Sequence, residues 1–259
     1  MLNSMNDWTI AVIGVGQIGG SFALALKEKR IGKRIIGVDR EDNVEGLRVS
    51  GILDEVTSNL KEGIKDADLI FLSTPVLTIL EMLPGIISLM KQTCVLLDSG
   101  STKKQITDIM KRYPDKYLIG GHPMTGREDS GFAAADPELF KGKIFSLSFP
   151  TKKGEMAKNL VCQILESIGA IPNVIDSEHH DVLVAMTSHL PYVLSLTLST
   201  LAEELFEEDK MFQRFVASGF LGATRLSGTQ EDMGAGMLKT NSRNITKMIE
   251  MFQARLERM

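Results

Sequence analysis

The sequence predicts an α/β domain with a mostly parallel sheet over residues 1–176, followed by an all-α domain over residues 177–259. In the first part, short apolar and β-branched runs alternate with helical patterns, which is typical of parallel strands joined by crossover helices. In the second part, strand signals stop and helical patterns cover about 178–206, 209–223 and 235–258. A chain of 259 residues is long enough for both domains.

The first predicted strand, residues 8–13, runs directly into a glycine-rich turn. Residues 14–19 form a G-x-G-x-x-G motif, and an apolar helix pattern follows, so the motif stands between a strand and a helix. Gly14 permits the tight turn, Gly16 lets the backbone approach a pyrophosphate, and Gly19 lets the helix pack on the strand. This segment predicts a Rossmann-type dinucleotide site.

The second predicted strand, residues 34–38, supplies an acidic partner for that turn. It ends at Asp39, about 20 residues beyond the last glycine, where a carboxylate binds the adenosine ribose and repels the 2′-phosphate of NADP. Arg40 next to it weakens that preference. The backbone amides of Gln17 and Ile18, at the helix N-terminus, would point at the phosphates. NAD is therefore the expected cofactor, and the alternative is a glycine turn followed by a surface aspartate.

Two further strands, 67–72 and 94–97, end in polar side chains. Because the carboxyl ends of the strands line the ligand crevice of an open α/β sheet, Thr74 is placed to touch the nicotinamide half of the cofactor. The alternative is that Thr74 caps the next helix. Ser99 and Ser101 follow the fourth strand, where one serine can cap a helix and the other can bind a substrate oxygen.

The segment 120–131 carries a histidine, a proline and four glycines directly after a predicted strand at 117–119. Pro123 restricts the preceding residue to extended backbone, so His122 is expected at a strand exit. An imidazole fixed in this way suits a general base, because its pKa lies near working pH. A structural histidine at a strand end is the alternative. After this segment, the sequence predicts a strand at 143–149, a helix at 154–168 and a strand at 171–175, which completes the α/β domain.

The helical part contains a second candidate histidine and an arginine. His189 stands just before the helix-kinking Pro191, and a core or interface histidine is the commoner role for such a residue. Arg225 follows a run of small residues, a setting for bidentate capture of a carboxylate, whereas a solvated arginine is the default alternative. A helical block of about 80 residues is small for an independent core, so we expect it to bury surface against the first domain or a second copy.

Composition and charge exclude several function classes. A formal net charge of −4 offers no electrostatic footprint for nucleic acid or an anionic membrane. Cys94 and Cys162 lie in apolar surroundings and are expected to be buried thiols. Adjacent His179 and His180 would point about 100° apart on a helix, so we predict no metal site. We see no signal peptide and no clean apolar span of ~20 residues, and we expect a cytoplasmic protein with no membrane partner.

Taken together, the motifs resemble the prephenate dehydrogenase family (the prephenate/arogenate dehydrogenases of tyrosine biosynthesis). The matching elements run in family order from residue 8 to about 241, and the His-Pro-Met and Ser-His-Leu-Pro elements are the most discriminating. These elements are the glycine turn at 14–19, Asp98-Ser99-Gly100-Ser101-Thr102-Lys103, Gly121-His122-Pro123-Met124 with Glu128 and Ser130-Gly131, His180-Asp181 leading to Ser188-His189-Leu190-Pro191, and Thr224-Arg225.

The resemblance implies a Rossmann-type domain, a helical domain through which two subunits form a homodimer, and an active site between the domains. It also implies NAD-dependent oxidative decarboxylation of prephenate to 4-hydroxyphenylpyruvate, with arogenate left open as a co-substrate. In this family pattern, His122 takes the proton of the ring hydroxyl, Ser101 supports that hydroxyl and Arg225 binds the ring carboxylate. His189 would lie near the substrate, and Glu128 would shape the side-chain end of the pocket.

Two other functions stay open at this point. One is a dehydrogenase or reductase for a β-hydroxy acid or an imine, although such enzymes give no reason for a strand-end His-Pro-Met. The other is a catalytically silent NAD-binding sensor. Segment 226–233 lacks the Asp-Pro and Trp that the family usually shows there, which leaves substrate preference open. The sequence also shows no regulatory or chorismate mutase domain, so any tyrosine feedback is expected at the active site.

Overall fold

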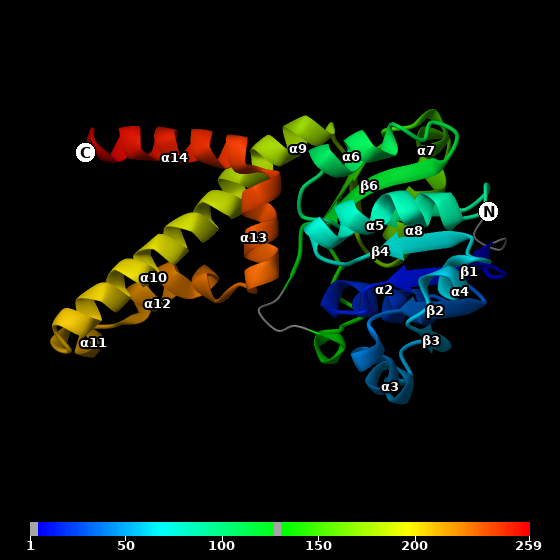
Figure 1. Ribbon diagram of the computed structural model, residues 1–259, viewed down its shortest axis with the longest axis horizontal. Coiled ribbons are helices and arrows are strands. Elements are labelled where there is room, and N and C mark those ends of the chain that lie inside the picture. Colours follow the sequence, from blue (N-terminus) through cyan, green and yellow to red (C-terminus); the bar gives the residue numbers. More distant parts are fainter. Residues whose placement is uncertain (1–4, 127–130) are drawn as a thin grey trace. The chain divides into compact units, whose positions relative to one another are not determined.

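The computed structural model describes residues 5–126 and 131–259, and the chain forms two compact units, residues 1–180 and 181–259 (Figure 1). We call these the first and second unit. The first unit is an α/β fold and the second is helical. The α/β and helical classes that the sequence predicts are therefore confirmed.

One sheet forms the centre of the first unit, and its described strands follow the order β3-β2-β1-β4-β5-β6-β7-β8. All neighbouring strands are parallel except β6 and β7, which are antiparallel. The order 3-2-1-4-5-6 is that of dinucleotide-binding folds, in which the ligand crevice lies where the strand order reverses, here between β1 and β4. The strands are β1 (Thr9–Ile13), β2 (Arg34–Val38), β3 (Glu55–Thr57), β4 (Leu69–Leu72), β5 (Val95–Asp98), β6 (Tyr117–Pro123), β7 (Ile144–Ser148) and β8 (Ile171–Val174).

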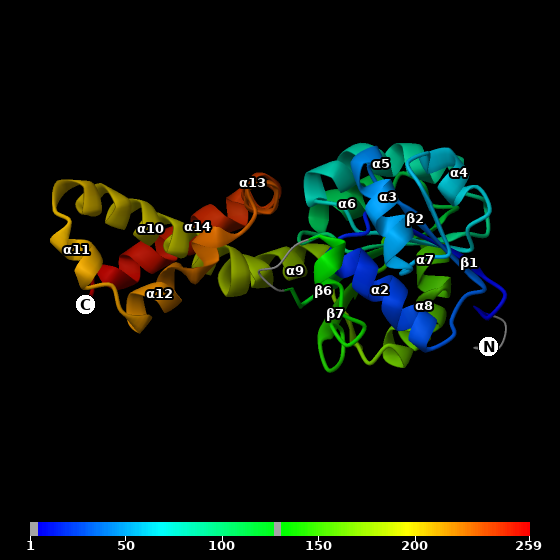
Figure 2. The ribbon, with the colours of Figure 1, turned by 90° about the horizontal axis from the view of Figure 1, so that it is seen from below.

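Helices cover both faces of this sheet, and alternate residues of each strand face opposite sides. Ile10 and Val12 of β1 pack with helices α2, α3 and α8, whereas Ala11 and Ile13 pack with α4, α5 and α6. Figure 2 shows α4 and α5 on one side of the sheet and α2 and α8 on the other. The bounds are α2 (Gln17–Glu28), α3 (Glu41–Ser50), α4 (Leu60–Ile64), α5 (Val76–Leu89), α6 (Lys104–Met110), η1 (Phe132–Ala134), α7 (Lys152–Met156) and α8 (Lys158–Ser167).

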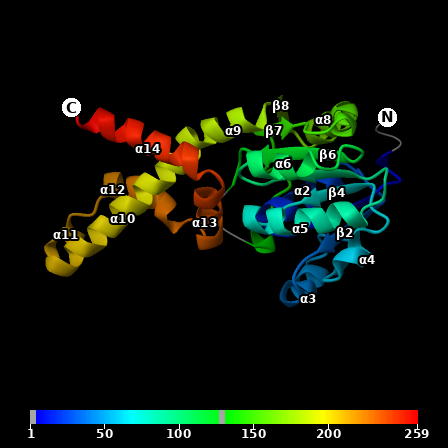
Figure 3. The same cartoon turned by 45° about the horizontal axis from the view of Figure 1, so that its top comes forward.

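The second unit has a small core and a large exposed apolar surface. Ala185, Leu190, Ile245 and Met248 form its buried cluster. In Figure 3, α12 runs alongside the long yellow helix α10, which it contacts. The helical segments are α9 (Ser177–Val184), which begins in the first unit, η2 (Ala185–His189), α10 (Leu190–Glu208), α11 (Met211–Arg214), α12 (Ser218–Thr224), η3 (Arg225–Gly228), α13 (Glu231–Thr240) and α14 (Ser242–Leu256).

The helical run 177–208 is long and apolar enough, by length and composition alone, to cross a membrane. Only 33% of its most apolar window is buried within the chain. This finding differs from the expectation of no clean apolar span, because the Ser, Thr and Pro residues that interrupt the segment lower its mean hydropathy only slightly. An exposed apolar helix of a helical domain gives the same signal when it packs against a partner subunit.

The structure corrects several local expectations. β6 continues through Pro123, so His122 lies within a strand rather than at its exit, because residues 120–123 pair with β7. The helix expected at 154–168 is two helices that meet at Ala157. Cys94 is buried as expected, and burial raises the pKa of its thiol to about 12. Cys162 is only half-buried, so the expectation of a buried thiol was wrong there.

Candidate active site

The three motif glycines meet three different structural demands. Gly14 has a φ of +81°, and a Cβ there would lie 2.6 Å from the carbonyl oxygen of Ser73. A Cβ at Gly19 would lie 2.0 Å from the carbonyl oxygen of Gly14, so the start of α2 packs directly on the turn. A Cβ at Gly16 would meet nothing within 4 Å, which leaves open space where a pyrophosphate would approach. The turn at Gly14 and the close packing at Gly19 agree with the reasons given for these two glycines from the sequence, and the role of Gly16 stays a prediction.

Helix α2 begins at Gln17, so the amides of Gln17 and Ile18 belong to its first turn, where four N–H groups have no partner within the helix. The positive end of the helix and these amides form an anion site. Asp39 lies beside the turn, and its carboxylate accepts hydrogen bonds from Val15 N (2.6 Å) and from Asn43 Nδ2 (2.7 Å). The carboxylate is thus held next to the glycine turn, where an adenosine ribose would bind.

Thr74 lies on the other side of the same turn. Its Oγ1 is buried without a hydrogen-bond partner, and its methyl group would lie 2.8 Å from a Cβ at Gly14. Thr74 does not cap α5, because the N-cap residue is Pro75 and no side chain caps that helix. A buried hydroxyl without a partner is costly, and a bound polar ligand would satisfy it. Thr74, the glycine turn and Asp39 therefore fit a nicotinamide dinucleotide.

His122 lies on β6, opposite Ser146 of β7, and its side chain is half-buried. Its Nδ1 is 2.9 Å from Nε2 of His180, and the two rings meet edge to face, at an interplanar angle of 72°. One ring nitrogen of His122 is therefore engaged inside the first unit. If Nδ1 carries the proton in that contact, Nε2 is the nitrogen that can act as a base.

A buried ion pair fixes the backbone beside His122. The carboxylate of Asp98, at the end of β5, and the ammonium of Lys103 are both fully buried and form a salt bridge. Asp98 also accepts the amide of Gly121 (3.1 Å), the residue before His122, and the amide of Gly100 (2.8 Å). Burial raises the pKa of Asp98, while Lys103 and the two amides oppose that rise.

The salt bridge between Asp98 and Lys103 was not predicted, although both residues belong to the matching segment 98–103. A lysine placed five residues after the aspartate that ends a buried strand was the available signal. Ser101 lies between them in the loop before α6 and is half-buried. The alternative role of Ser101 as a helix cap is not seen, because α6 begins at Lys104 without a side-chain cap. Ser99 is tied to β4, since its hydroxyl donates to Leu72 O (3.3 Å).

The second unit carries the remaining described candidates. His189 ends the π-helical turn η2 and is buried, and its Nδ1 lies 3.1 Å from Nδ2 of Asn241. That amide nitrogen also donates to Asp181 O (2.7 Å), and because it is a donor, the contact assigns the acceptor role to His189 Nδ1. Arg225 begins η3 and is exposed. Glu128 lies outside the described residues.

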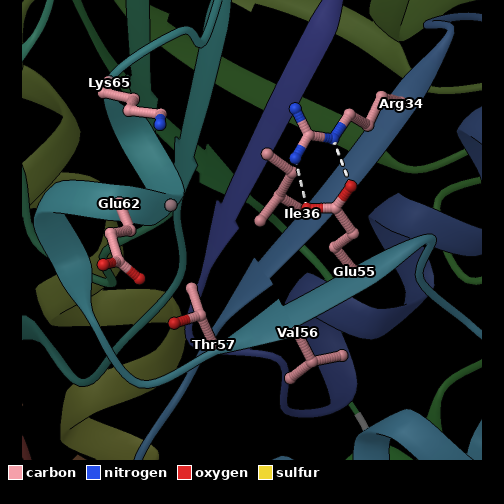
Figure 4. Close-up of a pocket in the computed structure, with 8 residues that line it drawn as sticks. Arg34, Ile36, Glu55, Val56, Thr57, Glu62 and Lys65 are labelled. Carbon is pink, nitrogen blue, oxygen red and sulfur yellow. Dashed lines mark hydrogen bonds and ion pairs between the residues drawn. The ribbon is translucent and has the colours of Figure 1, made fainter.

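Within the described residues, no group of three His, Cys, Asp or Glu side chains could hold a metal ion. His180 is buried and His179 is exposed. A separate pocket lies between the β2–β3 edge and α4, and Figure 4 shows its charged lining. There Arg34 Nε donates to Glu55 Oε1 (2.7 Å), so these two charges are paired. None of the predicted site residues lines this pocket.

Two family models together match most of the chain. The model described as "Prephenate dehydrogenase, nucleotide-binding domain" matches residues 22–174. The model described as "Prephenate dehydrogenase, dimerization domain" matches residues 176–259. In the sequence, the boundary between the two matches lies close to the boundary between the two units, at residues 180 and 181.

Curated relatives and solved structures give the same family. The chain is 32% identical to the prephenate dehydrogenase of Bacillus subtilis, over 94% of this chain and 67% of the relative. It is 26% identical to the cyclohexadienyl dehydrogenase of Zymomonas mobilis, over 96% and 86% of the two chains. The structure of prephenate dehydrogenase from Aquifex aeolicus, in complex with hydroxyphenyl propionate and NAD+, superposes with a TM-score of 0.89 at 28% identity, over 97% and 88% of the two chains. Synechocystis arogenate dehydrogenase superposes with a TM-score of 0.79 at 28% identity, over 96% and 90%. The chain therefore belongs to the prephenate dehydrogenase family of NAD-dependent oxidoreductases.

Proposed function

We propose that this protein catalyses the NAD-dependent oxidative decarboxylation of prephenate to 4-hydroxyphenylpyruvate. The observation that carries the proposal is the placement of His122: a half-buried imidazole on β6, one of whose nitrogens is already engaged, beside the backbone that Asp98 fixes. Oxidation of a secondary alcohol needs a base at the hydroxyl and a hydride acceptor at the carbinol hydrogen. His122 is the proposed base, and NAD is the hydride acceptor.

The reaction balances without a net proton. NAD, held by the glycine turn, Asp39 and Thr74, would supply the acceptor for the carbinol hydride of the substrate. His122 takes the hydroxyl proton as the ring alcohol becomes a ketone. The ring carboxylate then leaves as CO2, and its bonding electrons pass through the ring to the oxygen. That oxygen takes back a proton from His122 and becomes the phenol hydroxyl. The imidazole must therefore accept a proton and return it in one turnover.

Other side chains are proposed to position the substrate. Ser101 would hydrogen-bond the ring hydroxyl, and Arg225 would bind the ring carboxylate. Arg225 has a limited task, because stabilising the carboxylate too strongly would oppose decarboxylation. His189 and Glu128 are proposed to line the pocket. Orientation is the main demand on the site, since formation of an aromatic ring drives the reaction forward.

A direct assay tests the proposal. Purified protein with NAD and prephenate should produce NADH, which absorbance follows, and chromatography should identify 4-hydroxyphenylpyruvate. A higher kcat/KM with arogenate would change the substrate and keep the reaction class. A β-hydroxy acid as the only active substrate would favour the alternative dehydrogenase, and NAD binding without turnover would favour the sensor.

Arg225→Ala should mainly raise the KM for prephenate, by about tenfold or more, because a charge-assisted bidentate contact to the substrate is lost. The KM for NAD should change little. Steady-state kinetics with each substrate varied in turn measure both constants. Arg214→Ala, on the same unit, is the matched control, and an unchanged prephenate KM in Arg225→Ala would remove Arg225 from the site.

Asp39→Ser should lower the preference for NAD over NADP by about tenfold or more, because the carboxylate no longer repels a 2′-phosphate. The ratio of kcat/KM for the two cofactors measures this change. Asp42→Ser, which neutralises a nearby exposed carboxylate in the first turn of α3, is the control. A ratio that stays the same in Asp39→Ser would show that Asp39 does not contact the adenosine ribose.

We infer that the second unit forms a homodimer. Its core is small, and large apolar side chains are exposed on it, among them Leu201, Phe212, Phe215 and Leu221. Exposed apolar surface of this kind marks an interaction site, and the family model that matches this unit describes a dimerization domain. Analytical ultracentrifugation should give twice the mass of the chain. We also propose a cytoplasmic location, which fractionation of cells would test.

A further inference from the structure

We propose that His180 is the positioning residue that sets the tautomer of His122 and, by accepting its Nδ1–H, stabilises the imidazolium that forms when His122 takes a proton from the substrate. The inference rests on the proposed function for its catalytic consequence. It adds a residue to which neither the family resemblance nor the charge pattern gives a role.

The proposal is based on the contact between the rings of His122 and His180. His122 Nδ1 and His180 Nε2 are 2.9 Å apart, a hydrogen-bond distance, and the ring centroids are 5.1 Å apart. His180 is 2% exposed and His122 is half-buried, so the contact is partly shielded from water. A hydrogen bond between two imidazole nitrogens needs the proton on one of them and a lone pair on the other.

The chemistry of the base decides which nitrogen carries the proton. To accept the substrate proton at Nε2, neutral His122 must carry its own proton on Nδ1. Nδ1–H then donates to Nε2 of His180, whose proton is on its Nδ1. The opposite arrangement would leave Nε2 of His122 protonated and unable to act as a base. When Nε2 of His180 accepts this hydrogen bond, the contact therefore favours the tautomer of His122 that can act as a base, with its proton on Nδ1.

The position of His180 is itself fixed by the start of α9. Its amide donates to Asp176 O (2.8 Å). The Asp176 carboxylate accepts the amides of Glu178 (2.9 Å) and His179 (3.2 Å), and these bonds cap the helix. The backbone amide of His179 is the main cause that lowers the pKa of Asp176. A capped helix start thus holds the His180 ring against β6.

A neutral partner suits a base that must give its proton back. A carboxylate in the place of His180 would stabilise the imidazolium of His122 strongly, as in a Ser-His-Asp triad. The imidazole of His180 accepts the Nδ1 proton of His122 without placing a full negative charge beside the His122 ring. The charged groups on the neighbouring elements are largely paired: Asp98 with Lys103, and Lys104 with both Asp108 and Glu178. Asp176 is engaged with helix amides, as described above, and Asp181 is buried at the next position of α9.

The test compares two substitutions at His180. His180→Leu removes the acceptor, and His180→Gln keeps an acceptor near the position of Nε2 but cannot bind a proton. We expect kcat to fall by about tenfold to a hundredfold in His180→Leu, less than the roughly 10²–10⁴-fold effect of losing a general base. His180→Gln should recover part of that loss. The acid limb of the pH profile of kcat/KM should move in His180→Leu, which a purely structural role would not cause. His179→Leu, at the exposed neighbour, is the control and should leave both readouts unchanged.

A second measurement does not depend on the substrate. Nitrogen-15 NMR of the histidine rings in the dimer with NADH should show His122 protonated on Nδ1 in the natural protein and shifted toward Nε2 protonation in His180→Leu. Natural protein with His122 protonated on Nε2 would overturn the proposal, whether or not the variants fold. An Nδ1 tautomer in a protein that is inactive on prephenate and arogenate would support the contact and overturn only the proposed function.

Discussion

His122→Asn should reduce kcat by about 10²–10⁴-fold, because positioned general bases contribute rate factors of that size. Asparagine keeps a polar side chain of similar width in β6, so the pairing with Ser146 of β7 and the fold should persist. The dissociation constant for NADH should stay nearly unchanged, since the glycine turn and Asp39 are remote in sequence from β6 and are held by their own contacts.

Stopped-flow single-turnover kinetics with prephenate separate the chemical step from product release, and NADH fluorescence gives the cofactor affinity. His179→Asn makes the same chemical change at an exposed histidine and should behave like the natural protein. A loss of NADH affinity as large as the loss in kcat would mean that His122 holds the cofactor rather than the reacting hydroxyl.

The nucleotide half of the candidate site could be predicted from the sequence, because its determinants are local. The strands at 9–13 and 34–38 are continuous β-branched runs, and the glycines between them act within a few residues of one another. β3 was missed because Glu55–Thr57 is a three-residue strand at the edge of the sheet, without an apolar run. A short edge strand of this kind leaves little pattern to detect.

The proposed catalytic half of the site depends on contacts that sequence patterns do not contain. The extension of β6 to Pro123 requires antiparallel pairing with β7. The contact from His122 to His180 spans 58 residues. The π-helical turn before Pro191 was also not predicted. In this turn Leu190 N donates to Ala185 O, and the turn ends there because the next residue, Pro191, has no backbone N–H. Asp181, Ala185, His189 and Tyr192 are all buried.

Lys103→Met should destabilise the first unit by about 3–5 kcal/mol, because it leaves the fully buried carboxylate of Asp98 without its countercharge. The loss should be smaller in acid. Burial raises the pKa of Asp98 above its value in the unfolded chain, and without Lys103 the opposing attraction is gone. The folded variant then holds a proton that the unfolded chain has released, so its stability increases as pH falls through the raised pKa. Urea unfolding followed by circular dichroism, at several pH values, measures this dependence.

The double substitution Lys103→Met with Asp98→Asn should recover most of the lost stability. The side-chain oxygen of the asparagine at position 98 can still accept a hydrogen bond from the backbone N–H of Gly100 or Gly121, and no charge remains buried. Because the Asp98 carboxylate joins the Ser101 loop to the strand of His122, kcat should stay below that of the natural protein even where stability returns. Lys104→Met, at the adjacent and partly exposed lysine, is the control. A Lys103→Met variant no less stable than that control would show that the buried pair does not hold β5, β6 and the Ser101 loop together.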